Sequence, residues 1–328
     1  MKINIREVKG KKYAYLEKSI RVKEKTRKIS KYLGPLDNIN KNDLNKLKKE
    51  FGQEFIQKEV NLRTRLLDIK RFEYPFSLEE IKKIEEMNLK YHKIIKDLHT
   101  KSVEDLNKRF IANYVFESNA LEGNSLTLKN VAEVVFEDRI SQGKDLREVY
   151  DAQNSYNLFL FLKKTRSNID HDFIIKIHSL LMKKIDDRLG YRQESIVLLG
   201  KATELAAPED IYSEMNKLLR WYKQNEDRLY VLELAFKFHA KFEKIHPFCD
   251  GNGRVGRFLL NYILMKKNYF PIIIRKTSRN KYIKALESAD INKWIVLMRF
   301  ALSTYKLTFR NFFETYYDHL IITTDNNR

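Results

Sequence analysis

One short stretch of the sequence combines residue types that could bind a phosphate group and act on it. His246–Arg257 reads His-Pro-Phe-Cys-Asp-Gly-Asn-Gly-Arg-Val-Gly-Arg, and apolar residues at helical spacing flank it on both sides. We therefore expect two helices joined by a turn. Gly251-Asn252-Gly253 tolerates positive φ, so successive backbone N–H groups can form a concave nest before the second helix begins. Such a nest, at the positive end of a helix dipole, binds anions, and phosphate is the natural ligand.

The polar side chains of this stretch indicate what could happen to the phosphate. Arg254 and Arg257 are three residues apart, so they share one face of the first helical turn and can hold phosphate charge. His246 precedes a proline, which places it outside helical geometry, and its imidazole can accept a hydroxyl proton. Asp250 would repel phosphate unless a cation such as Mg²⁺ bridged the two. For each residue alone, the alternative is a surface turn with a packed histidine and solvated arginines.

The stretch resembles the signature of the Fic family, His-x-Phe-x-(Asp or Glu)-Gly-Asn-Gly-Arg-x-x-Arg, and matches it at every fixed position. The resemblance implies an enzyme that transfers AMP from ATP to a Ser, Thr or Tyr hydroxyl of a protein target, with release of pyrophosphate and with Mg²⁺ as cofactor. It implies that His246 is the base, Asp250 the Mg²⁺ ligand and Phe248 a core anchor. The implied phosphate contacts come from the turn and the helix after it: Gly251, Asn252, Gly253, Arg254 and Arg257.

A second informative stretch covers residues 118–124. Gly123 is typical of a helix C-terminus, so the preceding helix, over about 103–122, carries Glu122 in its last turn. A carboxylate there faces the negative end of the helix dipole and gains from a cationic partner, for which Arg257 is a candidate. From the residues alone, a solvated surface glutamate is the alternative.

Ser118-x-x-x-Glu122-Gly123 resembles the inhibitory motif of Fic proteins that carry their own inhibitory helix. The resemblance implies that Glu122 competes with the γ-phosphate of ATP for Arg257 and keeps the enzyme inhibited. An alternative within the same family is that Glu122 positions a water molecule that removes AMP from a modified protein. The sequence does not separate these two functions.

The resemblance also implies further parts of the site. Residues about 190–207 correspond to the Fic flap, a short β-hairpin that pairs with the backbone of the protein target. Tyr282 and Asp290 stand where family members contact the adenosine. His178 continues an apolar helical pattern, and we expect it to be a packed core histidine.

The composition predicts a mainly α-helical fold. The chain has 328 residues with only 10 glycines and 5 prolines, and its long charged segments show helical spacing. Its one cysteine, Cys249, excludes an intramolecular disulfide and a multi-cysteine metal site, so we expect a cytoplasmic protein. The first residues lack the apolar core of a signal peptide, and we expect no membrane partner.

The N-terminal segment is the most basic part of the chain. Residues 1–50 contain 16 Lys and Arg against 6 Asp and Glu, which is over half of the net charge of +19. Residues 1–36 alternate β-branched and aromatic residues between turn signals and predict a small β-meander. The tyrosines Tyr13, Tyr15 and Tyr32 alternate with cations and could contact nucleic acid, although a solvated sheet face explains the pattern too. A DNA-binding regulator with the Fic core as its sensor is thus a second class of function.

These patterns divide the chain into three parts. Residues 1–36 form the basic β-meander, 37–76 a helical connector, and 77–318 the Fic-type helical core with its flap and C-terminal helices. The aromatic residues over 309–317 predict either packing on this core or the surface of a homodimer.

Overall fold

The computed structural model describes residues 1–22, 25–39, 46–47, 50–66, 75–137, 139, 143–196 and 205–319. The chain forms two compact units, Met1–Lys93 and Ile94–Arg328, with the boundary inside helix α3 (Leu78–Asp97). The three-part division of the chain at residues 36 and 76 stays a prediction.

The first unit contains the predicted β-meander. Strands β1 (Lys2–Val8), β2 (Lys11–Val22) and β3 (Lys25–Pro35) form one antiparallel sheet in the order β1-β2-β3, and the short helix η1 (Leu36–Asn38) follows. Lys9 and Gly10, with φ of 51° and 72°, form the two-residue turn between β1 and β2. Both are left-handed, as the turns that match the twist of a hairpin require.

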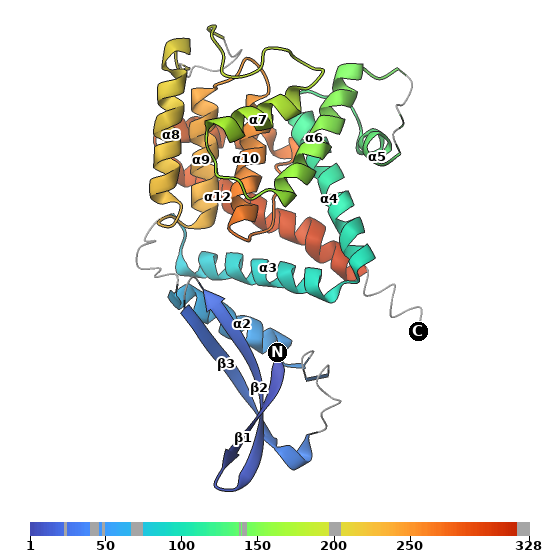
Figure 1. Ribbon diagram of the computed structural model, residues 1–328, viewed down its shortest axis with the longest axis vertical. Coiled ribbons are helices and arrows are strands. Elements are labelled where there is room, and N and C mark those ends of the chain that lie inside the picture. Colours follow the sequence, from blue (N-terminus) through green and yellow to red (C-terminus); the bar gives the residue numbers. More distant parts are fainter. Residues whose placement is uncertain are drawn as a thin grey trace. The chain divides into compact units, whose positions relative to one another are not determined.

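Helix α2 (Gly52–Leu66) packs on one face of this sheet (Figure 1). Leu16 and Ile20 of β2 are buried, as are Phe55 and Val60 of α2. At the edge of this apolar layer Lys31 pairs with Glu54 at 2.8 Å. Burial of these side chains explains why a polar sequence over residues 52–66 still forms a packed helix.

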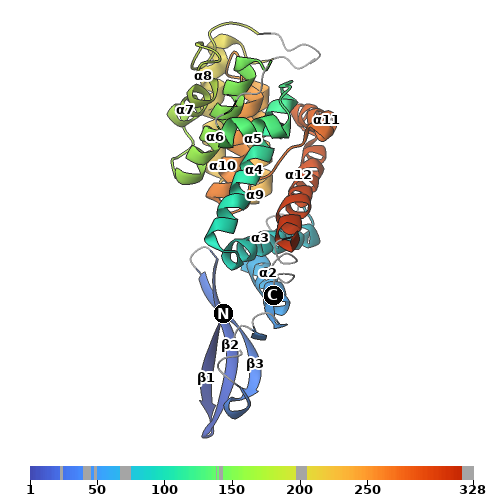
Figure 2. The same cartoon turned by 90° about the vertical axis from the view of Figure 1, so that its right-hand side faces the viewer.

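The second unit is helical, so the predicted mainly α fold is confirmed (Figures 1 and 2). Its α-helices are α4 (Thr100–Leu121), α5 (Leu128–Phe136), α6 (Leu146–Lys164), α7 (His171–Met182), α8 (Ile211–Asn225), α9 (Val231–Ile245), α10 (Asn252–Lys266), α11 (Arg279–Asp290) and α12 (Trp294–Thr308). Short helical turns η4 (Pro208–Asp210), η5 (Lys276–Ser278) and η6 (Phe309–Glu314) complete it.

Polar caps start helices α3 and α5. Before α3, the N–H of Glu80 donates to the Ser77 hydroxyl at 3.2 Å and the N–H of Ser77 donates to the Glu80 carboxylate at 2.9 Å. Thr127 and Asn130 form the equivalent reciprocal pair before α5. Each pair satisfies two backbone donors that a helix start leaves without intrahelical acceptors.

Helices α9 and α10 form the centre of the second unit, and α8, α12, α6, α7 and α4 contact one or the other of them. Their large apolar side chains are fully buried, among them Phe236, Phe238, Phe242 and Phe258. The two helices approach most closely at Gly256, where an added Cβ would lie 2.7 Å from His239 Nδ1 and 2.5 Å from Glu243 Oε1. Only glycine fits at this crossing.

The aromatic C-terminal segment packs on the core, as one of the two alternatives predicted. Phe309 and Phe313 are buried, and the Phe313 ring stacks on that of Phe110 with centroids 5.2 Å apart. The homodimer stays a prediction. Within the described ranges, none of the helices has both the length and the apolar character needed to cross a membrane, and the cytoplasmic location stays a prediction.

Replacing Gly256 with alanine tests the close approach of α9 and α10. Helix propensity alone favours alanine by about 1 kcal/mol, but the added methyl group would overpack the crossing, at a cost of about 1–3 kcal/mol. We expect a net lower free energy of unfolding in urea denaturation. As the control, Gly52→Ala in α2 places its Cβ 3.4 Å from the tip of the Lys93 side chain, an ordinary contact. Gly52→Ala should leave the free energy of unfolding unchanged or raise it. Equal effects of the two variants would contradict the close approach of α9 and α10 at Gly256.

Candidate active site

His246 is placed outside helical geometry, as predicted. It caps the C-terminus of α9 in the left-handed conformation, with φ 54° and ψ 61°, a conformation that costs a non-glycine residue about 1–3 kcal/mol. Its Nδ1 lies 3.3 Å from the carbonyl oxygen of Glu243. Because a carbonyl can only accept, Nδ1 carries the hydrogen, and in the neutral ring Nε2 then carries the lone pair. This tautomer can accept a proton through Nε2.

Two side chains hold the turn after His246 in place. The Phe248 ring is fully buried and stacks on His178 with centroids 3.8 Å apart. His178 Nε2 donates to the backbone carbonyl of Asp250 at 3.1 Å. Burial lowers the pKa of His178, so the ring stays neutral. Phe248 as a core anchor and His178 as a packed core histidine are both confirmed.

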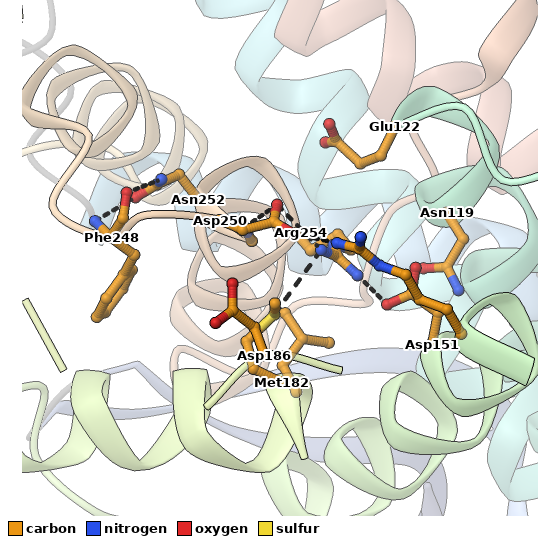
Figure 3. Close-up of polar contacts among 12 residues, drawn as sticks. Asn119, Glu122, Asp151, Met182, Asp186, Phe248, Asp250, Asn252 and Arg254 are labelled. Atoms are coloured by element: carbon orange, nitrogen blue, oxygen red, sulfur yellow. Dashed lines mark hydrogen bonds and ion pairs between the residues drawn. The ribbon is translucent and has the colours of Figure 1, made fainter. Parts of the chain in front are cut away.

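The Asn252 side chain bonds within the turn, and its contact with phosphate stays a prediction. Its amide accepts from the N–H of Phe248 at 2.9 Å and donates to the carbonyl of Phe248 at 2.7 Å, and the residue is buried (Figure 3). The side chain therefore closes the turn. Its backbone N–H lies in the first turn of α10, where N–H groups have no acceptor within the helix and can face an anion.

The nest predicted over Gly251-Asn252-Gly253 has fewer left-handed residues in the structure. Gly251 has the expected positive φ, 80°, but Asn252 and Gly253 already belong to α10. Gly253 is needed for space instead: a Cβ there would overlap the carboxylate of Glu122 and lie 3.0 Å from the guanidinium of Arg257. The anion site is thus one left-handed residue followed directly by a helix N-terminus.

Arg254 is buried and surrounded by acceptors from three segments. Figure 3 shows Asp151 of α6, Met182 of α7 and Asp250 of the turn around its guanidinium. It forms an ion pair with Asp151 and lies 3.4 Å from Asp250 Oδ1 and 3.8 Å from the Met182 sulfur. Burial lowers the pKa of Arg254 to about 10, which leaves it charged at neutral pH. Asp151 supplies the opposite charge that such a site needs.

Arg257 is bound by the end of α4, so the candidate pair with Glu122 is present in the structure. Its guanidinium donates to Glu122 Oε1 at 2.7 Å and to both the hydroxyl and the carbonyl of Ser118 at 3.0 Å. Burial by itself would lower the pKa of Arg257, and the charge of Glu122 reverses this, so the net pKa is raised. Burial would likewise raise the pKa of Glu122, but Arg257 lowers it below its ordinary value. The pair is therefore ionised at neutral pH and persists until the pH falls through that lowered pKa.

The backbone at the end of α4 presents Glu122 to this arginine. Gly123 has φ 98°, its N–H bonds to the carbonyl of Ala120 at 3.2 Å, and the N–H of Asn124 bonds to the carbonyl of Asn119 at 3.1 Å. These two bonds are the Schellman motif that ends a helix. The predicted C-terminal cap is confirmed.

Asp250, the predicted metal ligand, is bound by two arginines in the structure. Besides Arg254, it contacts Arg147 of α6, whose guanidinium lies 2.7 Å from Oδ2. Among the described residues there is no group of three His, Cys, Asp or Glu that could hold a metal ion. Mg²⁺ at a nucleotide, however, is held by one or two carboxylates together with substrate phosphates. The partly exposed carboxylate of Asp250, beside the predicted anion site, fits that donor set.

Arg192 joins this turn to the flanks of the predicted flap. It is buried, its N–H donates to the carbonyl of Pro247, and its Nε donates to the carbonyl of His246, both at 2.9 Å. Its other nitrogens donate to the carbonyls of Glu194 at 2.9 Å and Ala206 at 2.6 Å. The ends of the flap segment are thus fixed to the backbone that carries His246. The described flap residues, 190–196 and 205–207, contain no strand, and 197–204 lie outside the described residues.

The two residues predicted for the adenosine site occupy different environments. Tyr282 is buried, and its hydroxyl bonds to His239 Nε2 at 2.6 Å, so its ring is already packed in the core. Asp290 ends α11, and its carbonyl accepts from Lys244 at 3.2 Å. A contact of either residue with adenosine stays a prediction.

The sequence patterns missed Asp151, Arg147 and Arg192. Asp151 and Arg147 lie on α6, and they meet the turn only because α6 packs against α10. No local pattern marks Arg192 as buried, because the carbonyls that accept from its side chain are 2 to 54 residues away in the sequence.

The assembled site can bind a polyphosphate and deprotonate a hydroxyl. It offers the N-terminus of α10, two guanidinium groups on its first turn, the partly exposed carboxylates of Asp250 and Glu122, and an imidazole with an acceptor nitrogen. These are the parts that phosphoryl or nucleotidyl transfer requires.

Comparison with known proteins finds similarity to the family that the sequence motif resembles. Residues 168–264 match the model of the Fic/DOC family. The protein adenylyltransferase Fic of Nematostella vectensis is 31% identical over 54% of this chain and 43% of its own length. A probable protein adenylyltransferase of Aquifex aeolicus is 31% identical over 56% of this chain and 57% of its own length. The chain thus spans about half the length of these curated relatives.

A solved structure shares the fold. The Fic domain containing signaling protein from Bacteroides thetaiotaomicron superposes with a TM-score of 0.64 at 23% identity, covering 69% of this chain and 95% of that one.

Removing the charge of Asp151 should destabilise the second unit. Asp151→Asn removes the closer of the two carboxylates that pair with the buried Arg254 and leaves Asp250 at 3.4 Å, and breaking a buried pair costs about 3–5 kcal/mol. The measurement is the free energy of unfolding from urea denaturation. Asp227→Asn is the matched control, because Asp227 is 81% exposed and pairs with Lys267 at the surface, where such a pair contributes about 0–1 kcal/mol. Equal small losses in both variants would mean that Asp151 does not stabilise Arg254.

Proposed function

We propose that this chain, which contains a Fic domain in residues 168–264, is a protein adenylyltransferase that transfers AMP from ATP to a hydroxyl side chain of a protein target. One observation carries the proposal. The backbone of the turn sets His246, with Nε2 as its acceptor nitrogen, directly before a helix whose first turn bears the buried Arg254 and Arg257.

The residues of the site suggest how each would act. The triphosphate would lie at the N-terminus of α10, with its charge held by the first N–H groups of the helix and by Arg254 and Arg257. Asp250 would hold Mg²⁺, whose positive charge would favour departure of the pyrophosphate. When the magnesium nucleotide binds, Arg147 would have to release Asp250, to which it is bound at 2.7 Å.

His246 would act on the incoming hydroxyl. Its Nε2 takes the hydroxyl proton while the oxygen attacks the α-phosphorus of ATP. The new bond joins that oxygen to phosphorus, and the bond from phosphorus to the bridging oxygen of the β-phosphate breaks, which releases pyrophosphate. Arg192 would fix the position of the His246 backbone relative to the flap, where the family resemblance puts the target.

We further propose that Glu122 inhibits the enzyme by occupying Arg257. The carboxylate binds the guanidinium nitrogen at 2.7 Å, and a γ-phosphate bound to Arg257 would compete for the same donor. With Glu122 in place, ATP would bind with its γ-phosphate displaced and its α-phosphorus out of line with the attacking hydroxyl. Removal of AMP, with Glu122 positioning a water, is the alternative role of this residue.

His246→Ala should reduce transfer of AMP by at least about 100-fold, because a general base contributes about 10²–10⁴-fold to the rate. ATP affinity should change little, since the imidazole acts on the hydroxyl. Transfer is measured with labelled ATP in the Glu122→Gly background, and ATP binding by calorimetry. His319→Ala is the control, because His319 is exposed, and it should retain both AMP transfer and ATP binding. If His246→Ala loses ATP binding together with transfer, His246 is a nucleotide contact and the assignment as base is wrong.

Glu122→Gly should raise auto-modification by at least about 10-fold, because Arg257 regains a charge-assisted contact with the γ-phosphate. Glu104→Gly makes the same change at an exposed position of α4 and should leave activity unchanged, which controls for weakening of the helix. Adding Arg257→Ala to Glu122→Gly should abolish the gain. If Glu122→Gly instead leaves transfer unchanged and abolishes removal of AMP from a modified substrate, the alternative role is correct.

A further inference from the structure

The sheet face opposite α2 carries three tyrosines that pack against one another. Side chains alternate between the two faces of a strand, and the strand register places Tyr13, Tyr15 and Tyr32 on the same side. The ring of Tyr32 lies 5.4 Å from that of Tyr15 and 6.1 Å from that of Tyr13. Tyr32 is 51% exposed. The rings thus form a small aromatic surface that reaches solvent.

Cations share this sheet face with the rings. The register puts five of them on the same face: Lys2, Arg6, Lys11, Arg21 and Lys28. The guanidinium of Arg6 lies 4.3 Å from the centre of the Tyr15 ring and is also bound to Glu17. Glu17 is the one carboxylate that the described residues of this face provide. The face therefore combines one exposed and two half-buried aromatic rings with a net positive charge.

A groove extends this positive surface toward α2. It lies between β3 and α2 and is lined by Arg27 and Lys28 from the strand and by Lys58 and Arg65 from the helix. Lys28 thus lies at the sheet face and also lines the groove. A chain of negative charges could follow this path from the tyrosines into the groove.

We propose that this face binds single-stranded nucleic acid, with bases stacked on the tyrosines and phosphates held by the cations of the same face. Every base has a π-face, so stacking on aromatic side chains combined with a positive surface binds single strands with little sequence preference. Bases of a duplex are already stacked within the helix and cannot reach the rings. An acidic peptide would match the cations but would leave the tyrosines without partners. The inference is independent of the proposed transferase activity.

The test uses the full chain and a fluorescein-labelled single-stranded 12-mer of mixed sequence, as DNA and as RNA, with binding followed by fluorescence anisotropy. Tyr32→Ala should weaken binding by about 5- to 150-fold, the range for losing one base-stacking contact. Tyr32→Phe keeps the ring and should bind within about twofold of wild type. Lys28→Ala should reduce the slope of log affinity against log salt by about 0.7, since each phosphate contact on a single strand contributes that amount.

Controls separate this surface from general charge attraction. Tyr212→Ala, at a tyrosine of α8 that is 60% exposed, should bind like wild type, and circular dichroism of Tyr32→Ala should show an intact fold. If Tyr32→Ala is unfolded, the test of the proposal is the slope of log affinity against log salt in Lys28→Ala. The proposal is overturned if wild type does not bind the 12-mer, if a duplex 12-mer binds as tightly, or if polyglutamate of equal charge displaces it equally well. Auto-modification should be unchanged in Tyr32→Ala.

Discussion

Burial of two guanidinium groups on one helical turn is the constraint on which the second unit depends. Arg254 and Arg257 are both nearly inaccessible, and their like charges lie three residues apart on α10. Neither charge can be buried without an anion. The fold supplies Asp151 from α6 and Glu122 from α4, so two helices distant in the sequence are tied to the same turn. The protein's own carboxylates balance the charges with which a polyphosphate would be bound.

The two carboxylates are not equivalent. Asp151 is largely buried beside Arg254, whereas the side chain of Glu122 is 41% exposed at the end of α4. A negative charge at a helix C-terminus is disfavoured by the dipole, and water can solvate Glu122 if it leaves. The free energy needed to displace Glu122 from Arg257 is therefore lower than that needed to displace Asp151 from Arg254. This difference suits a permanent structural partner, Asp151, on Arg254 and a replaceable partner, Glu122, on Arg257.

Hydrogen bonds from side chains to backbone groups fix the turn after His246. Asn252 closes it from within, His178 holds the carbonyl of Asp250, and Arg192 binds the carbonyls of His246, Glu194 and Ala206. A catalytic base gains from such preorganisation, because the reacting atoms must be aligned within fractions of an ångström. One buried arginine thus links the alignment of the base to the segment where a protein target would be placed.

The sequence by itself determined the local features. Helix starts at Ser77 and Thr127, the helix end at Gly123 and the meander turns depend on capping and turn chemistry between near neighbours, so the sequence encodes them locally. The spacing from His246 to Arg257 also places the predicted base shortly before the helical turn that bears both arginines. The sequence suggested Glu122 as a partner of Arg257, but only the tertiary structure decided what the two arginines contact. Asp151, Arg147 and Arg192 approach through packing of separate elements, and Gly253 is required by the Glu122 side chain 131 residues away, a proximity that no local pattern encodes.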